Sequence, residues 1–182
     1  MNLPNKITVF RVLMIPVFLY FYLADPFPPV GAYIAFVAFV VASASDALDG
    51  YIARKHNLVT NFGKLMDPLA DKLLVSAALI AMTQVGVLPA WVSVVLISRE
   101  FFISGFRQLA LERNLVLAAS FWGKIKTITQ MAMILFLLLP VGLPIIMSVA
   151  YVSVKWVLIA ASVVFSVVSA AEYVYKNKGM WS

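Results

Sequence analysis

Cysteine is absent from this 182-residue sequence, and its single histidine, His56, lies among polar and basic residues. The lack of thiols excludes disulfide bonds and the thiolate metal sites of zinc and iron–sulfur proteins. We interpret His56 as a solvated loop residue rather than as a ligand or base. Charge is also scarce, because only 12% of the residues are charged and 63% are hydrophobic. A soluble domain is closer to half apolar, so the composition predicts a membrane protein.

Long polar stretches are missing, and the chain divides into six apolar segments of about 20 residues, the length that crosses a bilayer as a helix. The sequence therefore predicts an all-α polytopic membrane protein, a six-transmembrane-helix bundle in which residues 1–182 form one domain. The predicted spans are residues 3–23, 30–53, 64–84, 90–112, 121–139 and 155–175. Pro68 fits the third span only if that helix begins close by, because proline suits a first helical turn.

The last apolar segment, residues 145–175, is too long for one upright span. We expect an interfacial piece near residues 145–153, followed by a span that starts at Lys155 and Trp156. A snorkelling lysine and an aromatic side chain are both favourable at a membrane interface. The alternative is one long, tilted helix in which Lys155 is buried in the bundle.

Lysine and arginine are absent from the expected loops near residues 25–30, 85–90 and 140–144. By the positive-inside rule the opposite side is cytoplasmic, and an even number of spans places both termini there. We therefore expect a protein of the cytoplasmic membrane whose acidic residues face the cytoplasm. Because the basic residues sit at span ends and not in one solvated patch, they indicate contact with anionic membrane lipids and not with nucleic acid.

Carboxylates are few, yet four of the eight acidic residues lie within residues 46–71. Asp46 and Asp49 are spaced i, i+3, and Asp67 and Asp71 are spaced i, i+4, so each pair shares one face of a helix. The polar, basic connector between the pairs predicts a tight reversal that brings the four carboxylates together. Their mutual repulsion is removed by a hard divalent cation, so the cluster predicts a site for Mg²⁺ or Mn²⁺. The alternative is a set of salt-bridged residues at two helix ends, for which nearby cations are too few.

Two arginines interrupt the fourth predicted span, Arg99 near its middle and Arg107 two turns later. A charge at that depth costs about 2.5 kcal/mol or more, which points to a function. Lys124 and Lys126 open the fifth span. We expect a basic pocket between these two spans, beside the aspartates, that holds the phosphate of an acceptor. Alternatively, Arg99 pairs with Glu100 or another acid, and the two lysines only mark the cytoplasmic side.

Polar residues also form a stripe on the first span, where Asn5, Thr8 and Arg11 follow at i, i+3 and i+6. The stripe lies near the expected cytoplasmic end of the span, where contact with substrate phosphates is one interpretation. The other is polarity at a helix start combined with a topology marker.

The acidic stretch reads D-x-x-D-G-x-x-A-R, eight residues, then G-x-x-x-D-x-x-x-D. It resembles the motif of the CDP-alcohol phosphotransferase family, with every fixed position filled. The fixed positions are Asp46, Asp49, Gly50, Ala53, Arg54, Gly63, Asp67 and Asp71. Residues 4–11, 99–107 and 118–127 are similar to the phosphatidylglycerophosphate synthase branch of this family. The likeness covers essentially the whole chain and is weakest at residues 140–155.

This resemblance implies transfer of a phosphatidyl group from CDP-diacylglycerol to sn-glycerol 3-phosphate, giving phosphatidylglycerol phosphate and CMP. It implies two divalent cations held by the four aspartates, with Asp71 also the candidate base for the acceptor hydroxyl. It further implies a homodimer. We assign CDP-diacylglycerol binding to Gly50, Ala53, Arg54, Gly63, Asn5 and Thr8. We assign acceptor-phosphate binding to Arg99, Arg107, Lys124 and Lys126.

Two alternatives stay open at this point. One is an enzyme of the same family with another acceptor, and the basic pocket favours inositol phosphate over serine or choline. The other is a divalent-cation transporter that uses the four aspartates as an ion site, since carboxylates inside membranes mark ion pathways. The clustering of the acids at one surface and the lack of an evident inverted repeat argue against a transporter.

Overall fold

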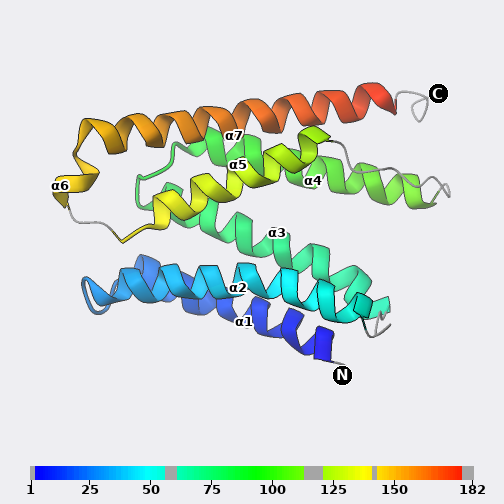
Figure 1. Ribbon diagram of the computed structural model, residues 1–182, viewed down its shortest axis with the longest axis horizontal. Helices are drawn as coiled ribbons and strands as arrows, with labels where there is room; N and C mark the ends of the chain where they lie inside the picture. Colours follow the sequence, from blue (N-terminus) through cyan, green and yellow to red (C-terminus); the bar gives the residue numbers. More distant parts are fainter. Residues whose placement is uncertain (1–2, 56–60, 113–120, 141–142, 178–182) are drawn as a thin grey trace. The chain divides into compact units, whose positions relative to one another are not determined.

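The computed structural model describes residues 3–55, 61–112, 121–140 and 143–177. Within these ranges, side chains are described except at positions 3–4, 46–55, 61–65, 67, 111–112 and 143–144. The described residues form helices and no strands, which confirms the all-α class (Figure 1). The helices are α1 (Leu3–Leu23), α2 (Val30–Lys55), α3 (Asn61–Gln84), α4 (Ala90–Glu112), α5 (Phe121–Leu138), α6 (Leu143–Ile146) and α7 (Val149–Lys176).

The helix boundaries follow the apolar segments of the sequence closely. The predicted spans 3–23 and 90–112 match α1 and α4 at both ends. α2 continues two residues beyond the predicted end, and α5 stops one residue before it. Apolar runs bounded by proline-containing or polar loops therefore fix these four helices.

The start of α3 differs from the prediction. The helix begins at Asn61, three residues before the predicted start, so Pro68 lies about two turns inside it and not in the first turn. Because proline has no N–H, the backbone carbonyl of residue 64 has no helical donor at that position. The helix ends at a turn in which Gly86 has a φ of 75° and Val87 N donates to Met82 O at 2.9 Å. A left-handed glycine is a common helix end.

The predicted division of residues 145–175 is wrong. The short helix α6 ends at Ile146, and α7 then runs without interruption for 28 residues from Val149. Ser148 caps this helix, because its side chain accepts a hydrogen bond from Tyr151 N at 3.2 Å. Lys155 therefore lies inside the helix and not at its start, with Nζ 5.8 Å from the centroid of the Trp156 ring. An N-cap serine is the local signal that the apolar pattern concealed.

Contacts among the described residues divide the chain into two units. Unit 1 comprises Met1–Leu88 with Leu138–Pro140, and unit 2 comprises Pro89–Leu137 with Val141–Ser182. In unit 1, α1 packs against both α2 and α3. Small side chains line the buried face of α2 at i, i+3, i+7 and i+10: Ala35, Ala38, Ala42 and Ser45. Such residues let helix backbones approach closely where no hydrophobic effect drives association.

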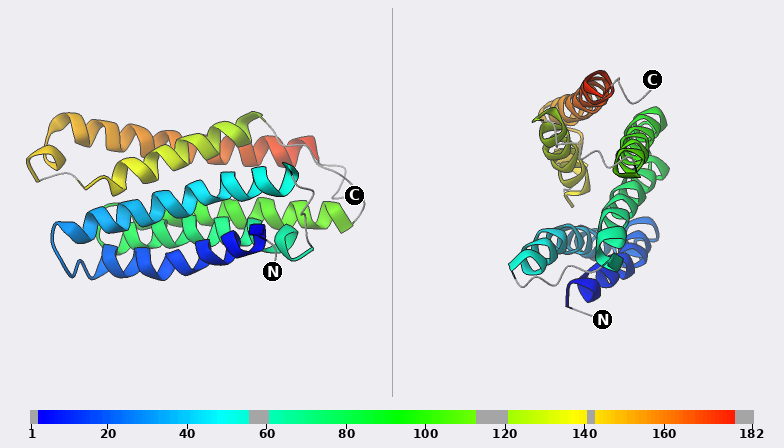
Figure 2. Two further views of the ribbon diagram at one scale, coloured as in Figure 1. Left: turned by 60° about the horizontal axis from the view of Figure 1, so that its bottom comes forward. Right: turned by 90° about the vertical axis from the view of Figure 1, so that its right-hand side faces the viewer.

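Figure 2 shows that α2 ends where α3 begins, at one end of unit 1, and that the N-terminal end of α1 lies there too. Elsewhere in the unit, Phe18 of α1 meets Phe39 of α2, with ring centroids 5.7 Å apart. Both side chains are fully buried. This packing fixes α1 and α2 against each other.

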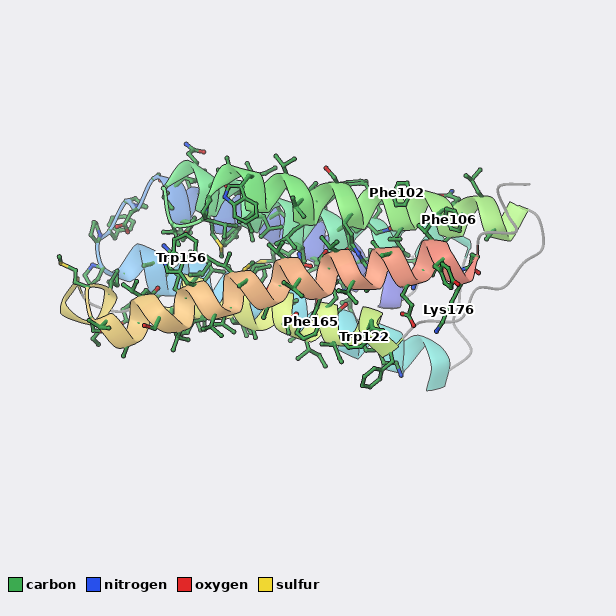
Figure 3. All side chains as sticks on the ribbon, turned by 90° about the horizontal axis from the view of Figure 1, so that it is seen from above. Phe102, Phe106, Trp122, Trp156, Phe165 and Lys176 are labelled. Carbon is green, nitrogen blue, oxygen red and sulfur yellow. The ribbon has the colours of Figure 1, made fainter. Side chains whose placement is uncertain are left out.

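In unit 2, α7 pairs with α5 in antiparallel register. Trp122 stacks on Phe165, Ser162 Oγ donates to Thr129 O at 3.1 Å, and the Phe136 and Tyr151 rings stack at 4.8 Å. Figure 3 labels the Trp122 and Phe165 pair. The buried residues of α7 recur at i, i+3, i+7, i+10 and i+14: Ile159, Ser162, Ser166, Ser169 and Tyr173. The sequence therefore presents a narrow, mostly polar stripe to its neighbours.

Within the described residues, three segments are long and apolar enough to cross a membrane, judged by length and composition. They are Asn5–Leu23, Phe121–Leu138 and Val149–Lys176, and a shorter apolar helix covers Val30–Ser45. α3 and α4 are not among these segments. They are long enough, with 24 and 23 residues, but they carry charged residues of the candidate site.

Candidate active site

The acidic motif lies on two helices, as the sequence predicts. Asp46 and Asp49 are in the C-terminal part of α2, and Asp67 and Asp71 are in the N-terminal part of α3. These two helix ends lie at the same end of unit 1 (Figures 1 and 2). Asp71 is half-buried. The other motif side chains lie outside the described part of the chain, and they are Asp46, Asp49, Gly50, Ala53, Arg54, Gly63 and Asp67.

The polar stripe of α1 faces the interior of unit 1. Asn5 and Thr8 are buried, and Arg11 has 0% of its surface exposed. Arg11 Nε donates to Ser45 Oγ at 3.3 Å, and Ser45 Oγ donates to Ala42 O at 2.7 Å. Ser45 directly precedes the first aspartate of the motif. Arg11 is therefore more than a topology marker, because it brings a guanidinium to the acid-bearing part of α2.

A second polar cluster joins three helices of unit 2 around Glu100. Its carboxylate forms ion pairs with Lys126 of α5 and with Arg99, whose Nη1 is 3.5 Å from Glu100 Oε2. Arg99 also donates to α7, from Nη2 to Ser169 Oγ at 2.7 Å and from Nε to Ser166 O at 3.3 Å. The structure thus brings Arg99 and Lys126 together, with a carboxylate between them.

The other two predicted phosphate ligands are exposed. Arg107 of α4 has its Cζ atom 5.6 Å from the centroid of the Tyr173 ring of α7. Lys124 is exposed on α5, and side chains two residues apart do not share a helix face, so it points away from Lys126. The four cations therefore separate into a largely buried pair, Arg99 and Lys126, and an exposed pair, Arg107 and Lys124.

Sequence reasoning missed the roles of Ser166, Ser169 and Tyr173, and it named Glu100 only as a partner of Arg99. The available signal was the spacing of small and polar residues along α7, which places residues 162, 166, 169 and 173 on one face. Periodicity identifies that face, but not the arginines that it contacts.

The two units carry different functional groups. Unit 1 offers an oxygen-only carboxylate motif, which suits hard divalent cations. Unit 2 offers guanidinium and ammonium groups, which bind phosphate through charge-assisted hydrogen bonds. Both types of group are common in proteins that bind phosphorylated ligands.

Comparison with known proteins agrees with this chemistry. The family profile of the CDP-alcohol phosphatidyltransferases matches residues 1–168. The CDP-diacylglycerol–glycerol-3-phosphate 3-phosphatidyltransferase of Bacillus subtilis is 46% identical, over 97% of this chain and 95% of the relative. A probable phosphatidylglycerophosphate synthase of Mycobacterium tuberculosis is 36% identical, over 95% and 80% respectively. A protein of Rickettsia bellii with the same name as the Bacillus enzyme is 40% identical, over 71% of each chain.

Proposed function

Because the chain belongs to the CDP-alcohol phosphatidyltransferase family, we propose that it transfers a phosphatidyl group from CDP-diacylglycerol to sn-glycerol 3-phosphate. The products are phosphatidylglycerol phosphate and CMP, and the reaction serves phospholipid biosynthesis. The observation that carries this proposal is the complete eight-position motif, whose halves lie on the adjoining ends of α2 and α3. The names of the relatives, which specify this donor and acceptor, support it.

The aspartates at positions 46, 49, 67 and 71 fit two hard divalent cations, Mg²⁺ or Mn²⁺. Their donor atoms are all carboxylate oxygens, and helical spacing places each pair on one face of its helix. When bound, such ions neutralise the diphosphate of CDP-diacylglycerol and the charge on departing CMP.

Asp71 is the general base of the proposed reaction. Its carboxylate accepts the proton of the glycerol 3-phosphate hydroxyl as that oxygen bonds to the phosphorus of the phosphatidyl group. The bond from the same phosphorus to the CMP oxygen breaks, and CMP leaves with the bonding electrons. Asp71 is one helical turn beyond Asp67 on α3, so it lies at the edge of the acidic motif.

The acceptor phosphate is bound by residues of unit 2. We assign direct contacts to Arg107 and Lys124, because their side chains are exposed. Arg99 and Lys126 add positive charge, and the ion pair of Lys126 with Glu100 links α5 to α4. CDP-diacylglycerol is bound by the motif residues Gly50, Ala53, Arg54 and Gly63 and by Asn5 and Thr8.

We also propose that the chain forms a single domain with six membrane spans, with both termini and the acidic motif on the cytoplasmic side. α2, α3 and α4 have 26, 24 and 23 residues, which at about 1.5 Å per residue exceed a hydrocarbon core of roughly 30 Å. Reaction of engineered single cysteines with a membrane-impermeant reagent tests the topology, since the natural chain has none. The homodimer expected from the family is tested by the mass of the detergent-solubilised protein.

The decisive experiment measures CMP release from CDP-diacylglycerol by the purified protein with Mg²⁺ or Mn²⁺. The acceptors are glycerol 3-phosphate, inositol phosphate, serine, choline and none. We expect release that depends on glycerol 3-phosphate and is lost in Asp71→Asn. A preference for inositol phosphate would reassign the acceptor within the family. Absence of release with every acceptor, combined with divalent-cation flux into proteoliposomes, would favour the transporter instead.

A further inference from the structure

Arg107 is exposed, yet its position is defined by an aromatic ring. Its Cζ atom is 5.6 Å from the centroid of Tyr173, within the range of about 6 Å in which a guanidinium is attracted to a ring face. The contact is with ring electrons and not with an acceptor atom, so it leaves the N–H donors of Arg107 available for a phosphate.

The Tyr173 ring extends from α7 and packs against α4. Tyr173 is 4% exposed and packs with Ile103 and Phe106 in one buried cluster, against which Ala170 lies. The Phe106 ring meets it edge to face, at 5.7 Å and 77°. Figure 3 shows Phe106 of α4 beside the C-terminal part of α7. A buried ring packed in this way is a fixed platform, whereas the arginine that lies over it is exposed to solvent.

The Tyr173 hydroxyl has no hydrogen-bond partner among the described residues. A buried hydroxyl without a partner is unfavourable, so hydrogen bonding among the described residues does not explain a tyrosine at this position. The polar contact that the side chain does make is between its aromatic face and Arg107.

A long arginine side chain loses much rotamer freedom when it binds a ligand. A ring that already restricts the arginine side chain in the unbound protein lowers this entropy loss and so increases the affinity for the ligand. We propose that Tyr173 is a positioning residue that orients Arg107 for the phosphate of the acceptor. This inference rests on the proposed function, because it takes glycerol 3-phosphate as the ligand of Arg107.

The test compares Tyr173→Leu and Tyr173→Phe in the full-length enzyme by steady-state CMP release. We expect Tyr173→Leu to raise the KM for glycerol 3-phosphate about threefold to tenfold, as loss of a cation–π contact predicts. The KM for CDP-diacylglycerol should stay within about twofold, because the contact is with a residue assigned to the acceptor. Phenylalanine keeps the ring face, so Tyr173→Phe should have the same KM for glycerol 3-phosphate as the wild type.

Phe165→Leu is the matched control, because Phe165 is also on α7 and stacks on an aromatic ring but contacts no cation in the described structure. It should leave the acceptor KM unchanged. A double-mutant cycle supplies the decisive measurement, since the effect of Tyr173→Leu on the acceptor KM should vanish in an Arg107→Ala background.

If the leucine variant does not fold, pentafluorophenylalanine at position 173 keeps the ring shape and reverses its quadrupole, and it should raise the acceptor KM in the same way. An effect of Tyr173→Leu that persists in Arg107→Ala, or a fall in stability with no change in acceptor KM, would overturn the inference and leave the proposed function intact. Failure of the wild type to use glycerol 3-phosphate would overturn both.

Discussion

Lys126 of α5 and Glu100 of α4 form an ion pair in which the lysine side chain is only 5% exposed. The same carboxylate also pairs with Arg99, so one acid serves two cations from two helices. A buried charge without a partner is strongly destabilising, whereas a paired one is tolerated. Glu100 therefore links α5 to α4 through Lys126 and at the same time balances the charge of Arg99.

Glu100→Gln should destabilise the protein by about 2–4 kcal/mol, because it leaves two cations without their counter-ion in a largely buried setting. Thermal unfolding in detergent, followed by circular dichroism, measures the change. Lys126→Gln should have a smaller effect, because Glu100 keeps its pairing with Arg99.

Lys176→Gln is the control for an ion pair in solvent. Lys176 pairs with Glu172 at 2.7 Å but is 65% exposed, so its loss should change stability by less than about 0.5 kcal/mol. Equal effects of Glu100→Gln and Lys176→Gln would show that the Glu100 cluster is not a structural centre.

Asp71→Asn should lower the rate of CMP release by about 100-fold to 10,000-fold, the usual contribution of a general base. Binding of CDP-diacylglycerol should remain largely intact, because the amide occupies the same space. Titration with the donor lipid alone measures binding, and CMP release measures turnover. Near-normal turnover in this variant would refute the assignment of the base.

Chelation of divalent cations should abolish CMP release, and added Mg²⁺ or Mn²⁺ should restore it. The same ions should raise the unfolding temperature, because in the proposed site they relieve repulsion among the four motif carboxylates. Asp46→Asn should reduce this thermal shift. Asp25→Asn should keep it, since Asp25 lies in the turn between α1 and α2 and outside the motif. Turnover that survives complete chelation would be incompatible with the proposed metal chemistry.

Arg107→Ala should raise the KM for glycerol 3-phosphate about tenfold or more, the effect of losing a hydrogen bond between charged groups. The KM for CDP-diacylglycerol should change far less. Lys155→Ala is a suitable control, because it also removes a cation that lies over an aromatic ring, but near the other end of α7. A similar rise in both KM values for Arg107→Ala would argue against an acceptor-phosphate site.

Ser45→Ala should destabilise unit 1 by about 1 kcal/mol, because the buried Arg11 guanidinium loses an acceptor. Ser153→Ala, the same substitution at an exposed position of α7, should have little effect. Thermal unfolding of the two variants side by side measures the difference. If both variants unfold together with the wild type, the contact between Arg11 and Ser45 contributes nothing to stability.

Helix positions were largely predictable from the sequence. α1 and α4 match their predicted ends because apolar runs in this chain stop at prolines and polar loops. The prediction failed at α7, where the capping bond of Ser148 begins a helix in the middle of an apolar run. It also failed at the start of α3, where α-helical backbone precedes Pro68 by two turns.

The sequence by itself determined the acidic motif, since spacings of three and four residues place carboxylates on one helix face whatever surrounds them. Only the tertiary structure decided how the basic residues are used. Arg99 finds its partners on α7, 67 and 70 residues away, and Lys126 finds Glu100 at a distance of 26 residues. Periodicity states which side chains share a face of one helix, but the identity of the facing helix is set by packing between helices. For that reason the pairing of Arg107 with Tyr173 became visible only in the folded chain.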